Sequence, residues 1–361
     1  MSWLAARCPH ATQAIRYPLP STAMHGPLMT TGSICLDLLL EDGQDFGALV
    51  AFDPHADWQM AFSIDRVDIG IFAVRLSQNG RPREIQLTVP DGHQTGLEGP
   101  ARLIYAWDSL TRWGRLTLMM PSGANLVSVD VKAPPPLPRC QVLDMLDTLP
   151  DRAMDSGLIG CSINDQIVPA APFAGLCPST RIATPGGPRS LQDLKRGDLV
   201  LSEDGDFVPI LYKLSRKRPS IGHDAIVCLR APYLGLQQNL SIAAQQRVVV
   251  AGDDVDYLFG QPQVRVPAQA LQNSAFTVPT PGNAGDLAVL SHVVLPGNQR
   301  IWANGALVET LFLGRLRRDR NGLAASALAH LDRNDLPEHR SDGTPVLRSF
   351  DAAVLAERRI A

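Results

Sequence analysis

The sequence contains no cysteine pair, and its six cysteines are scattered singly along 361 residues. No C-x-x-C spacing occurs, and the histidines do not gather around the cysteines. A zinc site and a disulfide framework both need such groupings, so the sequence disfavours both. We therefore expect isolated thiols, no metal and no other cofactor. The cysteines are Cys8, Cys35, Cys140, Cys161, Cys177 and Cys228.

Strong net charge and long apolar segments are missing as well. Charged residues make up 19% of the chain and the net charge is −3, which predicts no general affinity for nucleic acid. The apolar runs are too short to cross a bilayer, and residues 1–8 lack the basic start and apolar core of a secretory signal. We expect no transmembrane segment and a protein that is either cytoplasmic or exported without a leader.

What the chain does contain is a long series of short β-type segments. Between residues 34 and 131, apolar or alternating runs are separated by turn residues, with almost no helical period. Asn79-Gly80 is the strongest hairpin signal in this stretch. Because 361 residues exceed one ordinary core, two domains are expected. The first is predicted to be a β-sandwich over residues 1–132, of the jelly-roll or lectin-like type.

Two tryptophans in the middle of this region leave a question open. The segment Tyr105–Leu116 resembles a hairpin found in laminin-G and concanavalin-like jelly rolls. On that resemblance Trp107 or Trp113 is a platform on which a sugar stacks. Either indole can equally be a core residue that packs inside the hairpin.

A proline-rich stretch separates the two predicted domains. Residues 133–138 read Ala-Pro-Pro-Pro-Leu-Pro, which favours a semi-rigid polyproline spacer. We predict a linker and connector over residues 133–171. Short β-type runs then resume and continue to about residue 303, which predicts a second all-β domain.

The block from Cys177 to Val200 carries a specific pattern. A cysteine is followed by Thr-Arg-Ile-Ala-Thr, a Pro-Gly-Gly-Pro turn and then Leu-x-x-Leu-x-x-Gly-Asp-x-Val. This order resembles the opening block of the Hint domain, the self-processing module of hedgehog C-terminal regions and inteins. Runs at 229–235, 245–250, 291–297 and 303–310 resemble a bacterial branch of the same family, in the family's order.

The resemblance covers roughly residues 172–315 and implies a Hint-type β-disc. Residues 316–361 form a polar tail in which 323–331 and 350–359 have helical composition. The predicted fold class is therefore all-β: an N-terminal sandwich and a Hint-type β-disc with a short helical tail.

Hint domains cleave the chain at their own first residue, and the resemblance assigns parts of that chemistry here. Cys177 fits the nucleophile position, so the labile bond is Leu176–Cys177. The family's Thr-x-x-His motif maps onto 243–246, which places Gln246 where a histidine protonates the departing amine. A glutamine amide cannot carry that proton. His292 matches a family histidine and is either catalytic or a satisfied core residue among its apolar neighbours. Asp198 either organises a turn or orients a catalytic partner.

The residues leave two functions open. In the first, the chain cleaves itself at Leu176–Cys177 by an N-to-S acyl shift without splicing, with its own N-terminal segment as substrate. In the second, the Hint fold has lost its catalysis and serves as a scaffold beside a sandwich that binds carbohydrate or protein. Cys177 favours the first function. Gln246 favours the second, as does Glu309-Thr310 in place of the terminal His-Asn pair of inteins.

Overall fold

A computed structural model describes most of the chain. The described residues are 2–8, 10–18, 27–54, 59–90, 97–120, 126–149, 153, 155–170, 174–272, 274–280 and 282–360. The chain divides into two compact units. The first comprises residues 1–172 together with 320–329, and the second comprises residues 173–319 together with 330–361.

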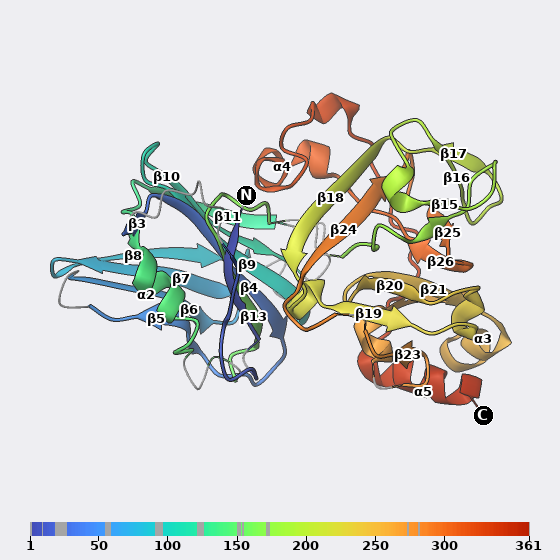
Figure 1. Cartoon of the computed structure of the whole chain (residues 1–361), viewed down its shortest axis with the longest axis horizontal. Helices are drawn as coiled ribbons and strands as arrows, with labels where there is room; N and C mark the ends of the chain where they lie inside the picture. The colour runs from blue at the N-terminus through green and yellow to red at the C-terminus, as the bar shows by residue number, and fades with distance from the viewer. Residues whose placement is uncertain are drawn as a thin grey trace. The chain divides into compact units, whose positions relative to one another are not determined.

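The first unit is a sandwich of two antiparallel sheets (Figure 1). Its seven-stranded sheet has the order β11-β10-β9-β4-β13-β1-β2, and its four-stranded sheet has the order β5-β6-β7-β8. The strands of the larger sheet are β1 (Trp3–Arg7), β2 (Ile15–Arg16), β4 (Thr31–Leu40), β9 (Gly99–Asp108), β10 (Trp113–Met119), β11 (Leu126–Lys132) and β13 (Leu158–Asn164). Those of the smaller sheet are β5 (Gly47–Phe52), β6 (Met60–Asp68), β7 (Ile71–Gln78) and β8 (Arg81–Thr88). A short pair, β3 (Leu28–Met29) with β12 (Leu137–Pro138), and helix α2 (Arg139–Asp144) complete the described elements of this unit.

A row of stacked aromatic rings holds the two sheets together. The Phe62 ring on β6 lies 5.6 Å from the Tyr105 ring on β9, and Tyr105 stacks on Trp107 at 5.5 Å. Trp107 is fully buried, and its Nε1 donates a hydrogen bond of 3.0 Å to the Met29 carbonyl. Trp107 is therefore a core residue and cannot be the exposed sugar platform that the hairpin resemblance suggested. The predicted Asn79-Gly80 hairpin joins β7 to β8, and both turn residues have positive φ.

The structure extends the sandwich beyond the predicted boundary at residue 132. Strand β13 lies within the stretch predicted as linker and connector, yet it pairs with β4 on one side and β1 on the other. Six of its seven residues are buried. The proline run does end β11, but the chain then returns to fill the gap between β1 and β4, because two strands with buried faces need a common neighbour.

The second unit is built from several small antiparallel sheets (Figure 1). The largest has the order β15-β14-β25-β26-β21-β22. Its strands are β14 (Arg181–Ile182), β15 (Arg189–Ser190), β21 (Arg247–Ala251), β22 (Gln263–Pro267), β25 (Arg300–Ala303) and β26 (Ala306–Glu309). The others are β16 (Leu199–Leu201), β17 (Phe207–Pro209), β18 (Tyr212–Pro219), β19 (Ile226–Leu229), β20 (Leu240–Ala243), β23 (Thr277–Val278) and β24 (Leu287–Val294). The fold is all-β, as predicted.

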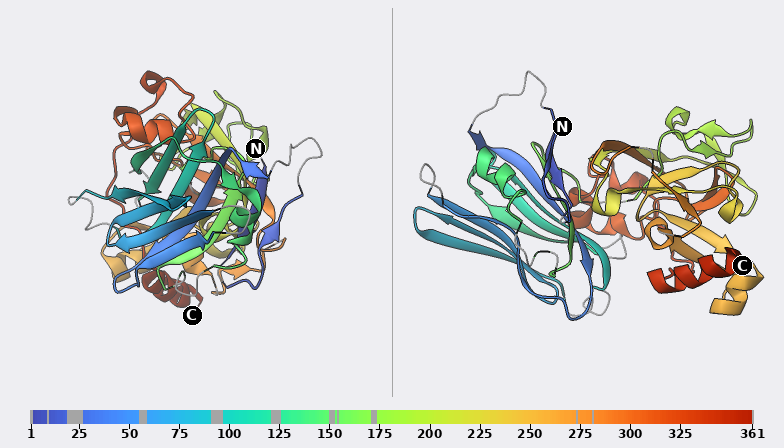
Figure 2. Two further views of the ribbon diagram at one scale, coloured as in Figure 1. Left: turned by 90° about the vertical axis from the view of Figure 1, so that its left-hand side faces the viewer. Right: turned by 60° about the horizontal axis from the view of Figure 1, so that its bottom comes forward.

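The helical tail contributes to both units. Helix α5 (Ser349–Ile360) packs beside α3 (Asp253–Phe259), as Figures 1 and 2 show, and buries Ala352 and Leu355 in the core of the second unit. The Arg359 guanidinium bonds both carboxylate oxygens of Asp254 at 2.6 and 2.9 Å. Helix α4 (Arg320–Ala325) belongs to the first unit.

Candidate active site around Leu176 and Cys177

Leu176 joins two sheets of the second unit into one. It forms an antiparallel bridge to Ile242 on β20 and a second to Ser291 on β24. Leu176 exchanges both backbone hydrogen bonds with Ser291, each 2.9 Å long. The next amide, Cys177 N–H, donates to the Ser241 carbonyl at 3.2 Å. The peptide between Leu176 and Cys177 is thus held on both sides by sheet hydrogen bonds.

The Cys177 thiol is largely buried and protonated near neutral pH. Burial raises the pKa of Cys177 to about 11, and the nearby Cys228 thiol adds to the rise. Ser241 lies between these two cysteines, because it pairs with Cys228 in the sheet and accepts the Cys177 amide. None of the six cysteines forms a disulfide. A thiol attacks a carbonyl as its thiolate, so this environment suppresses the nucleophile.

His292 shares a sheet face with Cys177 but does not stand opposite it. The Leu176–Ser291 bridge places Gly175 opposite His292, and Cys177 is therefore the diagonal neighbour, about 7–8 Å away in an antiparallel pair. Burial lowers the pKa of His292 to about 3; Arg216 lowers it further and Asp224 opposes the shift. The imidazole is neutral at pH 7. Cys177 and His292 do not contribute to each other's pKa shifts.

Gly175 occupies the position that the predicted nucleophile would need to face His292. Its φ of +145° is one that side-chain-bearing residues rarely adopt. A Cβ added there would lie 3.1 Å from the Leu290 Cβ and 3.2 Å from the Ser291 carbonyl oxygen. A side chain at position 175 would therefore press against β24 at Leu290 and Ser291. The sequence did not predict that Gly175 pairs with His292, because this pairing depends on the register between the two strands.

Gln246 is buried, and its side-chain amide bonds two backbone carbonyls. Its Nε2 donates to the Glu309 carbonyl at 3.0 Å and to the Arg247 carbonyl at 3.2 Å. Its Oε1 has no hydrogen-bond partner among the described residues. The amide therefore ties the start of β21 to the end of β26 and donates no bond to the candidate scissile peptide.

The comparison with known families decides which module this is. A family model described as "Hint domain" matches residues 174–315. Residues 174–315 form a Hint domain. No curated protein matches the chain.

Several solved inteins are similar to this chain at low sequence identity and low TM-score. The gp41-1 intein is 14% identical over 37% of this chain and 97% of its own, with a TM-score of 0.26. The AceL NrdHF class 3 split intein is 12% identical over 38% of this chain and 96% of its own, with a TM-score of 0.26. The MchDnaB-1 intein is 13% identical over 38% of this chain and 99% of its own, with a TM-score of 0.24.

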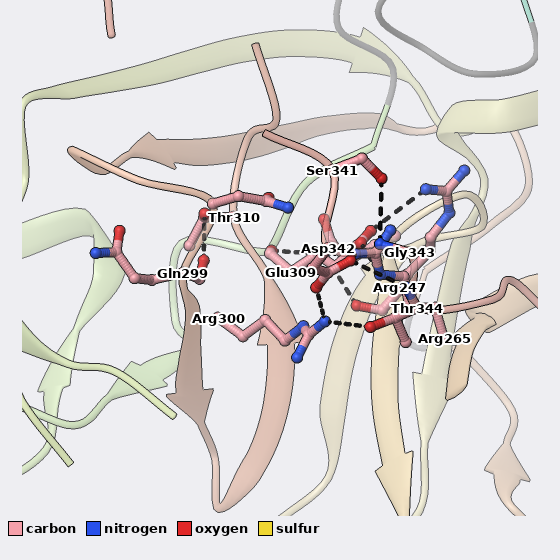
Figure 3. A network of polar contacts seen from close by, with 12 residues as sticks. Arg247, Arg265, Gln299, Arg300, Glu309, Thr310, Ser341, Asp342, Gly343 and Thr344 are labelled. Atoms are coloured by element: carbon pink, nitrogen blue, oxygen red, sulfur yellow. Dashed lines mark hydrogen bonds and ion pairs between the residues drawn. The ribbon is translucent and has the colours of Figure 1, made fainter. Parts of the chain in front are cut away.

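A network of charges surrounds Glu309, which the family resemblance aligned with the terminal His-Asn pair of inteins (Figure 3). The Glu309 carboxylate pairs with Arg265 at 2.8 Å and with Arg247 at 3.5 Å. Thr310 Oγ1 donates to the Gln299 carbonyl at 2.7 Å. Glu309 is thus held by salt bridges, and the Thr310 hydroxyl is bonded to the backbone.

The tail supplies a further acid to the same network. Asp342 pairs with Arg265 and Arg300, and Arg300 Nη2 also donates to Thr344 Oγ1 at 2.8 Å (Figure 3). Burial opposes ionisation of Asp342, but the Thr344 N–H and the two arginines outweigh it and lower the pKa of the carboxyl group. Val346 then pairs in parallel with Arg265 on edge strand β22. Sequence reasoning missed Asp342, which lies outside the Hint segment.

Asp198 lies in a turn and bonds its near neighbours in the sequence. Its Oδ2 accepts the Lys195 N–H at 2.9 Å and pairs with Arg189 at 3.2 Å. The Asp198 carbonyl accepts the Ile210 N–H at 2.9 Å. These contacts fit the turn-organising role.

Two features are absent from the residues that the structure describes. No three His, Cys, Asp or Glu side chains in this part of the chain lie together as metal ligands would. None of its helices is long and apolar enough to cross a membrane.

Proposed function

We propose that the Hint domain of this protein is a catalytically silent scaffold. The observation that carries the proposal is the Leu176–Cys177 peptide, whose carbonyl accepts the Ser291 N–H while its own N–H donates to Ser241. Attack on the Leu176 carbonyl carbon requires this peptide to become non-planar, and it cannot do so without breaking sheet hydrogen bonds.

The proton balance of the site points in the same direction. Cleavage requires a thiolate to form and a proton to reach the departing amine. The raised pKa of Cys177 opposes the first requirement. The second lacks a donor, since Gln246 cannot titrate and His292 is neutral with a pKa of about 3. Loss of a general acid costs on the order of 10²–10⁴ in rate.

Slow self-cleavage is the second candidate, and one observation favours it. The Ser291 N–H already bonds the Leu176 carbonyl oxygen at 2.9 Å, so one donor for a developing oxyanion is in place. In this reaction the Cys177 sulfur bonds the Leu176 carbonyl carbon, the C–N bond breaks, and the thiol proton ends on the new amine. Water then hydrolyses the thioester, which yields a Leu176 carboxylate and restores the thiol.

Intact mass spectrometry of the purified full chain separates the two functions. The scaffold function predicts one species of full-length mass after incubation with hydroxylamine or dithiothreitol. Fragments 1–176 and 177–361 that arise with time, and that disappear in Cys177→Ala, would refute it. His292→Gln serves as a second control. It should give the same single full-length species, because the neutral imidazole takes no part in the scaffold function.

We further propose that the sandwich carries the binding function. A depression of about 520 Å³ lies on the four-stranded sheet, and the residues that line it all belong to β5–β8 or directly follow β5. Small side chains such as Ala51 and Ala61 form part of it, and Ser63, Arg75 and Glu84 supply polar groups. Arg75 pairs with Glu84 at 2.9 Å and with the buried Asp65 at 3.2 Å. Neighbouring donors and acceptors of this kind suit a saccharide's hydroxyl groups.

A glycan array followed by titration tests this proposal. Arg75→Ala should weaken binding of any glycan identified by at least tenfold. Arg81→Ala is the matched control, because Arg81 is exposed on the same sheet but does not line the depression. An array without a hit, or equal affinities for both variants, would contradict carbohydrate binding at this site and leave a protein ligand to be sought.

A further inference from the structure

A short segment from beyond the Hint domain belongs to the N-terminal sandwich. Residues 320–329 are part of the first unit, whereas residues 173–319 and 330–361 make up the second. The chain therefore leaves the sandwich before the Hint domain, returns to it at Arg320 and leaves it again after Ala329. The Hint domain is in effect inserted into the chain of the first unit.

The segment is held in the sandwich by packing and by a hydrogen bond. Helix α4 packs against β11, which is an edge strand of the seven-stranded sheet and pairs only with β10 among the described strands. The Ala170 N–H donates to the Ala325 carbonyl at 2.9 Å. Because both residues belong to the first unit, this bond joins the two ends of the insertion.

Burial within the segment is one-sided. Leu323 is 9% exposed and Leu328 is 1% exposed, whereas Ala324 and Ala329 are exposed. Ser326 is buried between the two leucines; its Oγ donates to the Leu323 carbonyl at 2.8 Å and accepts the Leu328 N–H at 3.1 Å. These bonds satisfy the hydroxyl and let both leucine side chains be buried.

We infer that residues 320–329 are a non-covalent strap that retains the N-terminal fragment after any break in the chain between residues 170 and 177. A break at Leu176–Cys177, or a protease cut just before it, would then convert the protein into a two-chain complex and would not release residues 1–176. The inference goes beyond the proposed function, because it holds for a silent Hint domain and for an active one.

The test uses the full chain with a site-specific protease sequence inserted between Ala171 and Pro172 and an affinity tag at the N-terminus. After cleavage and native capture at submicromolar concentration, the C-terminal fragment should remain bound to the tagged fragment. The double variant Leu323→Asp/Leu328→Asp should lose at least tenfold of this retention. Ala324→Asp/Ala329→Asp, with the same added charge at exposed positions, should retain the fragment as the parent does.

Three outcomes would overturn the inference. The first is separation of the fragments in the parent protein. The second is equal retention in the parent and in the leucine double variant. If that variant does not fold before cleavage, a synthetic peptide of residues 318–331 decides the matter on the nicked parent. An excess of this peptide should displace the C-terminal fragment, a scrambled peptide should not, and failure of the native peptide to displace it is the third outcome.

Discussion

The reactivity of the Cys177 thiol is the sharpest consequence of the site geometry. Burial raises its pKa from the ordinary value of 9.0 to about 11. At pH 7.5 the thiolate fraction then falls about 100-fold, from roughly 3% to roughly 0.03%. The remaining thiolate is intrinsically more nucleophilic by about six- to tenfold, because nucleophilicity rises with pKa. Cys177 should therefore react about ten- to fifteenfold more slowly than an unshifted thiol, before any further slowing by restricted access.

The measurement is a timed reaction with a small aromatic disulfide, followed by peptide mapping that resolves each cysteine. Cys140 is exposed and serves as the internal reference within the same chain. At pH 7.5 we expect Cys177 to react at least tenfold more slowly than Cys140. The Cys177 rate should also continue to rise about tenfold per pH unit up to pH 10, because its titration lies above that range.

Two results would refute this reasoning. Equal rates for Cys177 and Cys140 at pH 7.5 would mean that burial does not suppress the thiolate. A Cys177 rate that reaches its plateau at or below pH 9 would place its pKa at the ordinary value. Either result would remove one support of the silent Hint domain and shift the balance toward self-cleavage.

Three further predictions concern stability, each measured by chemical denaturation. Because the pKa of His292 is lowered in the folded protein, the unfolded chain takes up the His292 proton at a higher pH than the folded chain does. The free energy of unfolding should therefore be highest above pH 6.5 and fall toward pH 3 by up to about 1.4 kcal/mol per pH unit. His292→Gln should reduce this slope, and an unchanged slope would contradict the buried neutral imidazole. Glu309→Gln should lower the free energy of unfolding by about 1–3 kcal/mol, because the largely buried Arg247 and Arg265 lose their carboxylate partner. Glu84→Gln removes an exposed ion pair and should lower it by at most about 1 kcal/mol. Equal losses would show that the network around Glu309 adds no stability. Gly32→Ala should lower the free energy of unfolding by about 1–3 kcal/mol, because the new Cβ would lie 2.7 Å from the buried Trp107 ring. A loss below about 0.5 kcal/mol would mean that the ring shifts to make room for the methyl group.

Strand positions were predicted well where one face of the strand is buried. The run Ile85–Val89 alternates, and β8 covers most of it; the Asn79-Gly80 turn sets the register of that hairpin. The weakest predictions fell where a strand pairs with a distant partner. Strand β13 follows a proline run and sits in a stretch that reads as a connector, so nothing local shows that it fills the space between β1 and β4.

The candidate site shows the same division. The order of motifs was enough to locate the Hint domain. The diagonal placement of Cys177 relative to His292 was not visible in the sequence, because it depends on the Leu176–Ser291 bridge. Asp342 likewise joins the arginine network through a tail outside the family pattern.

By itself, the sequence determined the all-β class, because turn residues and period-two alternation act over a few neighbouring residues. It located the Hint domain only through the resemblance of its ordered motifs to that family. The tertiary structure alone decided which residue faces His292, and that residues 320–329 complete the first unit. Both depend on which segments that are distant in sequence become neighbours. The burial of apolar sheet and helix faces against one another decides this pairing, and local sequence does not.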